Sequence, residues 1–229
     1  MRPLAPAGTG PAGGGRPVRP GLVAFDLDGT LTRGPSCLES IAAANGFAER
    51  MAVWETSRTE AEIRAARTGV WPILTGLAPD RITGPLADIP LAPGVFEGLG
   101  ALRAAGVPVV IVSLTFTLTV SWFAERFGVD DFIGTRPHGR GFRHVFPWTK
   151  PVLLAKHAAG LGVAMADVVA VGDSVGDVPM LRAVGRSVFV GPTLPDGLAP
   201  TWHLPGASIA AITALLLPDH DHQTVTSGT

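Results

Sequence analysis

Two aspartates stand directly after the first apolar run of the chain. The run covers residues 22–25, and Asp26 and Asp28 follow it two positions apart. A buried strand cannot end in two unpaired like charges inside a core, because removing both from water costs too much. At the carboxyl edge of a parallel sheet, where ligands of such folds bind, the two carboxylates suit Mg²⁺ and a phosphate group. A solvated turn before Gly29 is the alternative explanation.

A serine follows the second apolar run, at residues 107–112. Ser113 brings a hydroxyl beside free backbone amides, that of Leu114 included, just before a predicted helix. Hydroxyls and amides in such a position bind phosphate oxygens. Serine is also a common helix cap, so Ser113 by itself leaves both interpretations open.

Lysine is rare in this chain, and one lysine has an unusual position. Of 18 basic residues only Lys150 and Lys156 are lysines, and Lys150 immediately precedes Pro151. Proline favours the first turn of a helix, so Lys150 lies at or before a helix N-terminus, where a cation opposes the helix dipole. A compact charge for a phosphoryl oxygen would explain the lysine, and a solvated loop position is the alternative.

Two more aspartates follow the apolar run at residues 168–171. Asp173 is placed to complete a metal site with Asp26 and Asp28. Asp177 stands four residues later, before a helical segment that contains Pro179. It can cap that helix, act at the site, or do both.

These residues require a framework that brings distant segments together. Apolar runs typical of strands buried on both faces lie at residues 22–25, 107–112, 168–171 and 187–190. Helical patterns separate them, at residues 94–105, 118–127 and 151–160, with Gly106, Gly128 and Gly160 where helices should end. The alternation predicts an α/β fold with a doubly wound, Rossmann-like parallel sheet.

The connection between the first two strands is longer than a crossover needs. Helical patterns at residues 37–44, 49–68 and 79–88 predict a small helical cap, inserted after the first strand at residues 35–89, over the active edge of the sheet. Helices that merely cover a sheet face are the alternative. The expected organisation is a disordered Pro/Gly-rich tail at residues 1–21, an α/β core at 22–34 and 90–217, the cap at 35–89, and a flexible tail at 218–229.

Composition excludes several classes of protein. With 18 basic and 19 acidic residues the net charge is −1, so we expect no nucleic-acid partner. The apolar stretches are too short to span a bilayer, so we expect a soluble protein with no membrane association. One cysteine, Cys37, allows no internal disulfide, and the first 21 residues have no apolar signal core, so we expect a cytoplasmic location.

Taken together, the motifs resemble those of the haloacid dehalogenase superfamily of aspartyl-phosphate-forming phosphotransferases. The resemblance covers roughly residues 22–217 and rests on Asp26 with Asp28, then Ser113, Lys150, and Asp173 with Asp177, in that order. The insertion after the first motif and the sequence Gly-Asp-Ser-Val-Gly-Asp-Val-Pro-Met-Leu are most similar to the phosphoserine phosphatase-like branch.

The resemblance implies a role for each motif residue. Asp26 would attack phosphorus to form an acyl phosphate, and Asp28 would act as acid and then base. Mg²⁺ would be held by Asp26, the backbone carbonyl of Asp28, and Asp173. The phosphoryl oxygens would be bound by Ser113, Lys150 and the backbone at Gly29 and Leu114. Asp177 would orient metal waters or Lys150. Carbon–halogen hydrolases of the superfamily lack the second acid, so Asp28 argues against dehalogenation.

Departures from that branch bear on the substrate. Its phosphoserine phosphatases usually carry a glutamate just after the first motif and glycines after the serine, whereas this chain has Arg33 in the first stretch and Leu114 and Thr115 in the second. We therefore expect a sugar, polyol, nucleotide or carboxylated phosphoester rather than phosphoserine. The candidate specificity residues, which could equally be packing or solvated residues, are Arg33, Trp54, Arg58, Arg64, Arg67 and Trp71.

The motifs thus predict a Mg²⁺-dependent phosphatase that hydrolyses the phosphomonoester of a small metabolite through an aspartyl phosphate. A phosphotransferase or phosphomutase using the same intermediate, or a non-catalytic protein that binds a phosphorylated ligand, is the alternative. The oligomeric state is left open. A further segment, at residues 134–148, contains Gly139-Arg140-Gly141 and predicts a β-hairpin before Lys150.

Overall fold

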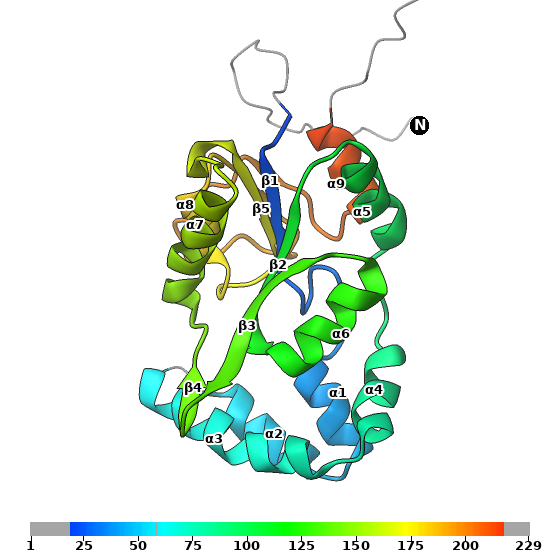
Figure 1. Ribbon diagram of the computed structural model, residues 1–229, viewed down its shortest axis with the longest axis vertical. Helices are drawn as coiled ribbons and strands as arrows, with labels where there is room; N and C mark the ends of the chain where they lie inside the picture. The colour runs from blue at the N-terminus through cyan, green and yellow to red at the C-terminus, as the bar shows by residue number, and fades with distance from the viewer. Residues whose placement is uncertain (1–18, 58, 218–229) are drawn as a thin grey trace, which may run out of the picture.

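A twisted sheet forms the centre of the computed structural model, which describes residues 19–57 and 59–217 (Figure 1). Its strands are β1 (Leu22–Phe25), β2 (Val109–Phe116), β3 (Asp131–His138), β4 (Gly141–Arg143), β5 (Val168–Gly172), β6 (Arg186–Phe189) and β7 (Trp202–His203). The order is β4-β3-β2-β1-β5-β6-β7. Neighbouring strands are parallel except β3 and β4. The predicted parallel α/β sheet is confirmed.

β1 is the central strand, and its side chains alternate between the two faces of the sheet. Val23 and Phe25 belong to one hydrophobic cluster, and Leu22 and Ala24 to the other. All four are fully buried. A strand with a core on each side must be apolar at every position, which is why the run showed no polar alternation.

Helices cover both faces of the sheet (Figure 1). The first cluster includes residues of α5 (Val95–Ala104), α6 (Thr117–Phe127) and α9 (Ile209–Leu216). The second includes residues of α7 (Lys150–Gly160) and α8 (Val178–Ala183). This two-sided packing is the doubly wound arrangement that the sequence predicted.

β2 is longer than its apolar run indicated. We expected the strand to end at residue 112, with Ser113 just before a helix; instead the strand continues to Phe116 and α6 begins at Thr117. The pairing of β2 with β3 shifts register between Val112 and Phe116. Ser113 therefore lies at an irregularity within the strand, and it is not at the N-terminus of a helix.

The long connection after β1 folds into α1 (Cys37–Ala44), α2 (Ala48–Glu55), α3 (Glu60–Gly76) and α4 (Pro79–Ala87). In Figure 1 these helices lie beyond the carboxyl ends of β1 and β2, not along a face of the sheet. Their buried residues, such as Met51 and Leu74, share a hydrophobic cluster with Leu27 and Phe116. We propose that they form a cap with the boundaries expected from the sequence.

One expected helix, at residues 49–68, is two helices. α2 ends at Glu55 and α3 begins at Glu60. The Thr59 side chain accepts a hydrogen bond from the Glu62 amide, and the Glu62 carboxylate accepts one from the Thr59 amide. This capping box starts a new helix, and its Thr-x-x-Glu signature was present in the sequence.

The remaining predictions about the framework have mixed outcomes. The hairpin is confirmed, since β3 and β4 pair antiparallel around Gly139. The predicted tails lie outside the described residues except for residues 19–21, of which Pro20 is buried and Gly21 donates a hydrogen bond to the Asp167 carbonyl at 2.9 Å.

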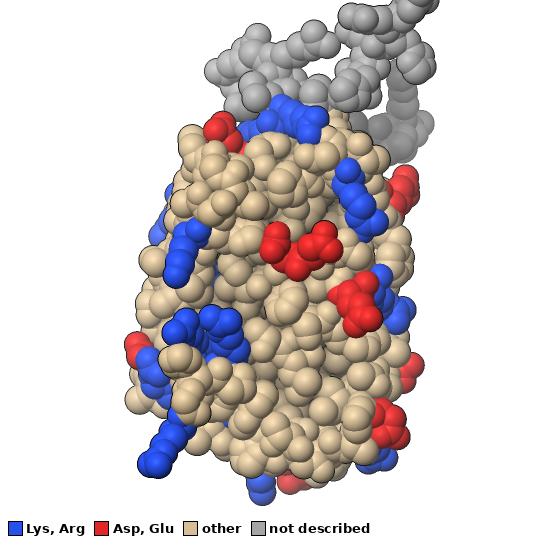
Figure 2. All heavy atoms as spheres, viewed as in Figure 1, with Lys and Arg blue, Asp and Glu red and all other residues tan. Residues whose placement is uncertain are grey.

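No helix within residues 19–57 and 59–217 has both the length and the apolar character needed to cross a membrane. On the face in Figure 2, acidic and basic side chains occur in small separate groups.

Candidate active site

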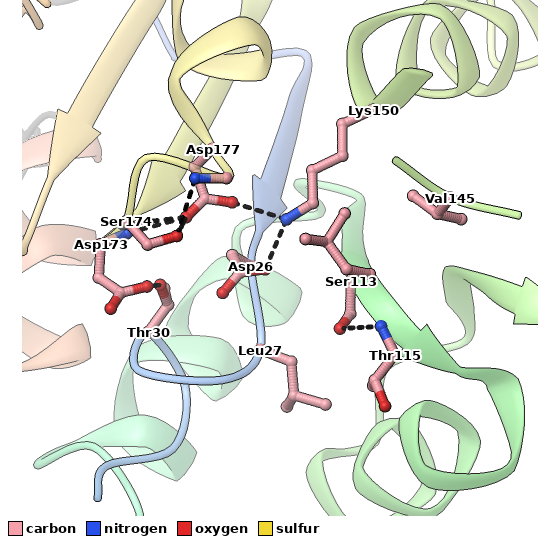
Figure 3. Close-up of polar contacts among 12 residues, drawn as sticks. Asp26, Leu27, Thr30, Ser113, Thr115, Val145, Lys150, Asp173, Ser174 and Asp177 are labelled. Atoms are coloured by element: carbon pink, nitrogen blue, oxygen red, sulfur yellow. Dashed lines mark hydrogen bonds and ion pairs between the residues drawn. The ribbon is translucent and has the colours of Figure 1, made fainter. Parts of the chain in front are cut away.

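Asp26 leaves β1 at the carboxyl edge of the sheet, where four segments of the chain converge (Figure 3). Its amide continues the sheet by donating to the Val171 carbonyl of β5 at 2.9 Å. The side chain is buried, and burial followed by the charge of Asp177 raises the pKa of Asp26 well above its usual value, although Lys150 opposes this.

Lys150, the first residue of α7, joins two of the motifs. Its Nζ lies 2.7 Å from Asp26 Oδ1 and 2.6 Å from Asp177 Oδ1, and the side chain is only 1% exposed. Burial lowers the pKa of this lysine, but the two carboxylates outweigh burial and raise it above its ordinary value. A buried lysine needs such partners, so the solvated loop position considered from the sequence is excluded.

Asp177 holds the lysine and the loop after β5 at the same time. While Oδ1 contacts Lys150, Oδ2 accepts hydrogen bonds from the amides of Asp173 and Ser174, each at 3.2 Å, and from Ser174 Oγ at 3.1 Å. Asp177 precedes α8, yet its side chain makes no capping hydrogen bond to that helix. The simple helix cap is therefore not its role.

Asp173 faces the first motif across the site (Figure 3). Thr30 Oγ1 donates to its Oδ1 at 3.2 Å, and burial followed by the charge of Asp177 raises the pKa of Asp173 to about 6. Gly29 has φ +87° and closely approaches the Asp173 carboxylate, so any side chain at position 29 would collide with it. Glycine here makes room for Asp173.

Oxygen atoms from Asp26, Asp173 and Asp177 lie within 4.8 Å of one another. Hard carboxylate oxygens in such a group suit a divalent cation such as Mg²⁺. The oxygens of Asp177 are already engaged by Lys150 and by the loop. Asp26 and Asp173 are therefore the carboxylates best placed for a metal.

Asp28 is held by the first residue of α1. The Cys37 amide donates to Asp28 Oδ1 at 2.8 Å. Burial raises the pKa of Asp28, a change that hydrogen bonds from Cys37 partly offset. A carboxyl group with a raised pKa is suited to proton transfer near neutral pH.

The hydroxyl of Ser113 is oriented by its own strand. Ser113 is buried, and its Oγ accepts a hydrogen bond from the Thr115 amide at 3.2 Å (Figure 3). The next carbonyl, of Leu114, accepts from Thr135 Oγ1 at 3.0 Å and from Arg67 Nη2 at 2.7 Å. These contacts fix the backbone of the irregular segment of β2.

A cavity of about 500 Å³ lies between these loops and the helices α1 to α3. Residues predicted from the sequence that line it are Asp26, Asp28, Ser113, Leu114, Lys150, Trp54 and Arg67. Those that the structure does not place on its wall are Gly29, Arg33, Arg64, Trp71, Asp173 and Asp177. Arg58 lies outside the described residues.

Three of the candidate specificity residues have other partners. Arg33 turns back to its own loop, where its Nη1 donates to the carbonyls of Gly29 and Thr30, and Nη2 donates to the Ala207 carbonyl at 3.3 Å. Arg64 pairs with Glu60, and Trp71 packs against the rings of Phe116 and Phe142, which also contact each other. The expected subsite around Arg33 is therefore not part of the cavity.

Some residues of the site were missed from the sequence. Thr30 lies within the first motif and could have been suspected from its place there. Ile63, Ala66 and Val70 line the cavity from α3 at helical spacing, a pattern that is visible but is more often a sign of core packing. Cys37 contributes a backbone amide, for which side-chain identity gives no signal.

Residues 23–182 match the model of the family described as haloacid dehalogenase-like hydrolase. The chain belongs to this family. Phosphoserine phosphatase of Albidiferax ferrireducens is 30% identical over 188 residues, which cover 73% of this chain and 77% of the relative. Phosphoserine phosphatase of Halobacterium salinarum is 30% identical over 182 residues, covering 75% and 86%. This haloacid dehalogenase-like hydrolase is thus a phosphoric monoester hydrolase of the phosphoserine phosphatase-like branch.

Solved structures share the fold of this haloacid dehalogenase-like hydrolase. A family hydrolase from Salmonella enterica serovar Typhi has a TM-score of 0.71 at 19% identity, with 89% of this chain and 73% of that chain covered. A substrate-bound phosphoserine phosphatase complex has a TM-score of 0.62 at 22% identity, with 75% and 86% covered. At these identities the likeness concerns the fold alone.

Proposed function

We propose that this enzyme is a Mg²⁺-dependent phosphatase that hydrolyses the phosphomonoester of a small molecule through a phosphoaspartate on Asp26. The observation that carries the proposal is the buried Lys150, which joins Asp26 to Asp177 on the wall of a cavity that Asp28 and Ser113 also line. Membership in the family and the phosphoserine phosphatase relatives support the reaction class.

The residues present fit a divalent cation. Oxygens of Asp26, Asp173 and Asp177 lie within 4.8 Å of one another, and Lys150 pairs with two of these residues, Asp26 and Asp177. Burial, followed by the charge of Asp177, raises the pKa values of Asp26 and Asp173. A positive charge between Asp26 and Asp173 would favour the ionised form of both. We propose that these two side chains and the Asp28 carbonyl hold Mg²⁺, which supplies charge neutralisation for the phosphate when bound.

In the first step the Asp26 carboxylate attacks the phosphorus atom of the ester. The bond from phosphorus to the ester oxygen breaks as the bond to Asp26 forms, which leaves an acyl phosphate on Asp26 and an alkoxide. Asp28, on the same wall and with a raised pKa, gives its proton to that alkoxide, so the alcohol departs neutral.

In the second step water replaces Asp26 on phosphorus. Asp28, now ionised, takes a proton from the attacking water, and the acyl phosphate bond breaks to regenerate the Asp26 carboxylate and release inorganic phosphate. Lys150 and Ser113 bind the phosphoryl oxygens in both steps, and Asp177 positions Lys150.

Phosphate release from p-nitrophenyl phosphate tests the proposal. With Mg²⁺ present we expect turnover, and Asp26→Asn should lower kcat by at least about 1,000-fold, because the nucleophile is lost. If Asp26→Asn retained most of the activity, the assignment of Asp26 as the nucleophile would be refuted. Transfer to an added alcohol without release of inorganic phosphate would show a phosphotransferase instead.

A further inference from the structure

The cavity has two chemically different ends. One end is polar and carries Asp26, Asp28, Ser113 and Lys150. The other is formed by the segment that carries α1, α2 and α3, and six apolar residues line it: Leu38, Met51, Trp54, Ile63, Ala66 and Val70. Four polar residues of the same segment line the cavity as well: Ser36, Glu55, Ser57 and Arg67. A phosphate bound at the polar end would direct the rest of the substrate against this apolar surface.

The apolar end is built into the packing of two helices. Ile63, Ala66 and Val70 stand on α3 at spacings of three and four residues, so they share one face of the helix. Trp54 of α2 lies against Gly69 of α3 so closely that a Cβ at position 69 would be 2.8 Å from its Cζ2. This contact fixes the indole at the edge of the apolar surface.

The charged groups at this end, Glu55 and Arg67, already have hydrogen-bond partners, and Glu55 Oε1 accepts a hydrogen bond from Ser36 Oγ at 3.5 Å. Within the described residues, the cations that line the cavity are Arg67 and Lys150. Arg67 donates from Nη2 to the carbonyls of Leu114 and Val145, each at 2.7 Å, and its Nη1 lies 3.2 Å from His144 Nδ1. Lys150 lies at the polar end, where it is held between two aspartates. A substrate carboxylate would therefore have to displace existing hydrogen bonds.

Building on the proposed function, we infer that the leaving group of the substrate is an alcohol with an apolar chain or ring that packs on this surface. An apolar chain or ring gains free energy by leaving water for a surface of this kind. A carboxylate placed against these six apolar side chains would lose water without gaining a hydrogen-bond donor from them. The enzyme therefore favours phosphoesters whose alcohol is apolar.

Primary alkyl phosphates from ethyl to hexyl test the inference, since their leaving groups have nearly the same basicity and differ in apolar area. We expect kcat/KM to rise about two- to fourfold for each added methylene. Butyl phosphate should therefore be a better substrate than ethyl phosphate. A flat or falling series would overturn the inference.

Two matched variants locate the effect. Ile63→Gln places an amide on the apolar surface and should flatten the dependence on chain length. Val53→Gln makes a comparable change on α2, at a residue that is 69% exposed and does not line the cavity, and should retain the full dependence. Equal behaviour of the two variants would contradict the placement of the alkyl chain.

A binding experiment separates this inference from the proposed reaction. Alkyl phosphonates have no ester bond to break, so their Kd values, measured by calorimetry, report the cavity without catalysis. Tighter binding with longer chains, in the absence of any hydrolysis, would support the inference and refute the proposed function. Hydrolysis of every ester, with no dependence on chain length in either assay, would support the proposed function and refute the inference.

Discussion

Arg67 on α3 donates a hydrogen bond from Nη2 to the carbonyl of Leu114 at 2.7 Å, and Leu114 directly follows Ser113. The same nitrogen donates to the carbonyl of Val145, which precedes the turn that leads to Lys150. One side chain of the helical insertion thus holds the backbone next to Ser113 and the backbone five residues before Lys150, and both of these residues are proposed to bind phosphate. Any displacement of α3 would be transmitted to both.

Replacing Arg67 by Gln should lower kcat/KM about tenfold or more, because small displacements of groups that position a substrate are costly to the rate. Steady-state kinetics with ethyl phosphate would measure this, alongside thermal unfolding to verify folding. Arg126→Gln is the control, since Arg126 stacks on Trp122 of α6, away from the cavity. Unchanged kinetics in the Arg67 variant would show that the linkage does not matter for turnover.

Lys150→Met should abolish activity and lower the free energy of unfolding by about 3–5 kcal/mol, because it leaves the buried carboxylates of Asp26 and Asp177 without their cation. Urea denaturation measures the loss. The double variant Lys150→Met/Asp177→Asn removes one of the unpaired charges, so its loss should be smaller than the sum of the two single losses. Simple additivity would contradict the ion-pair network.

Mg²⁺ should raise the melting temperature of the protein, and EDTA should reverse the rise. A cation that binds only the folded state stabilises it, by about 2–4 °C for each kcal/mol in a protein of this size. Asp173→Asn should weaken the response, because it removes one of the two carboxylates best placed for the metal. Differential scanning fluorimetry across a Mg²⁺ titration is the measurement. An equal response in the variant would exclude Asp173 as a ligand.

His144 should make the stability of the protein fall in mild acid. Burial, followed by the charges of Arg67 and Arg64, lowers its pKa to about 4, while Glu60 acts in the opposite direction. An unfolded chain takes up this proton below about pH 6.5, whereas the folded chain resists until about pH 4, so stability is lost as the pH falls through this window. Above about pH 6.5 the contribution of His144 to the free energy of unfolding no longer changes with pH.

Urea unfolding of the wild type and of His144→Gln at pH 7.5 and at pH 5 isolates this effect. The wild type should lose more stability between the two values than the variant does. The rings of Phe142 and Phe146 flank the imidazole and carry no charge. Gln places a neutral group in the same position but cannot take up a proton. Identical pH dependence in both proteins would contradict the assignment.

The chemistry of the site could be predicted from the sequence because the topology of the sheet restricts which residues can lie at one edge. Asp26 and Asp173 directly follow strands of a parallel sheet whose carboxyl ends share one edge, and Lys150 begins the helix that precedes β5, so the order of the three motifs implied that they meet. The continuous apolar runs indicated strands with helices on both faces. The capping box at Thr59 could also have divided α2 from α3.

The sequence did not predict the direction in which the long side chains point. Arg33 turns toward the carbonyl of Ala207, a partner 174 positions away, and Arg67 spans from α3 to β2 and to the segment after β4. Such contacts depend on tertiary placement, which residue type and local spacing do not encode. For the same reason β2 extended beyond its apolar run, since pairing with β3 continues past Ser113 at the register shift.

The hydrogen bond from Arg33 to Ala207 has a consequence for how the enzyme is made. The loop after β1 is synthesised before β5 and α9, yet its clamp includes a carbonyl just before α9, and β1 itself pairs with β5. A chain synthesised only as far as β5 would lack the Ala207 partner, and the loop would not be clamped. Phosphatase activity should therefore arise only after the segment before α9 has been synthesised and has docked.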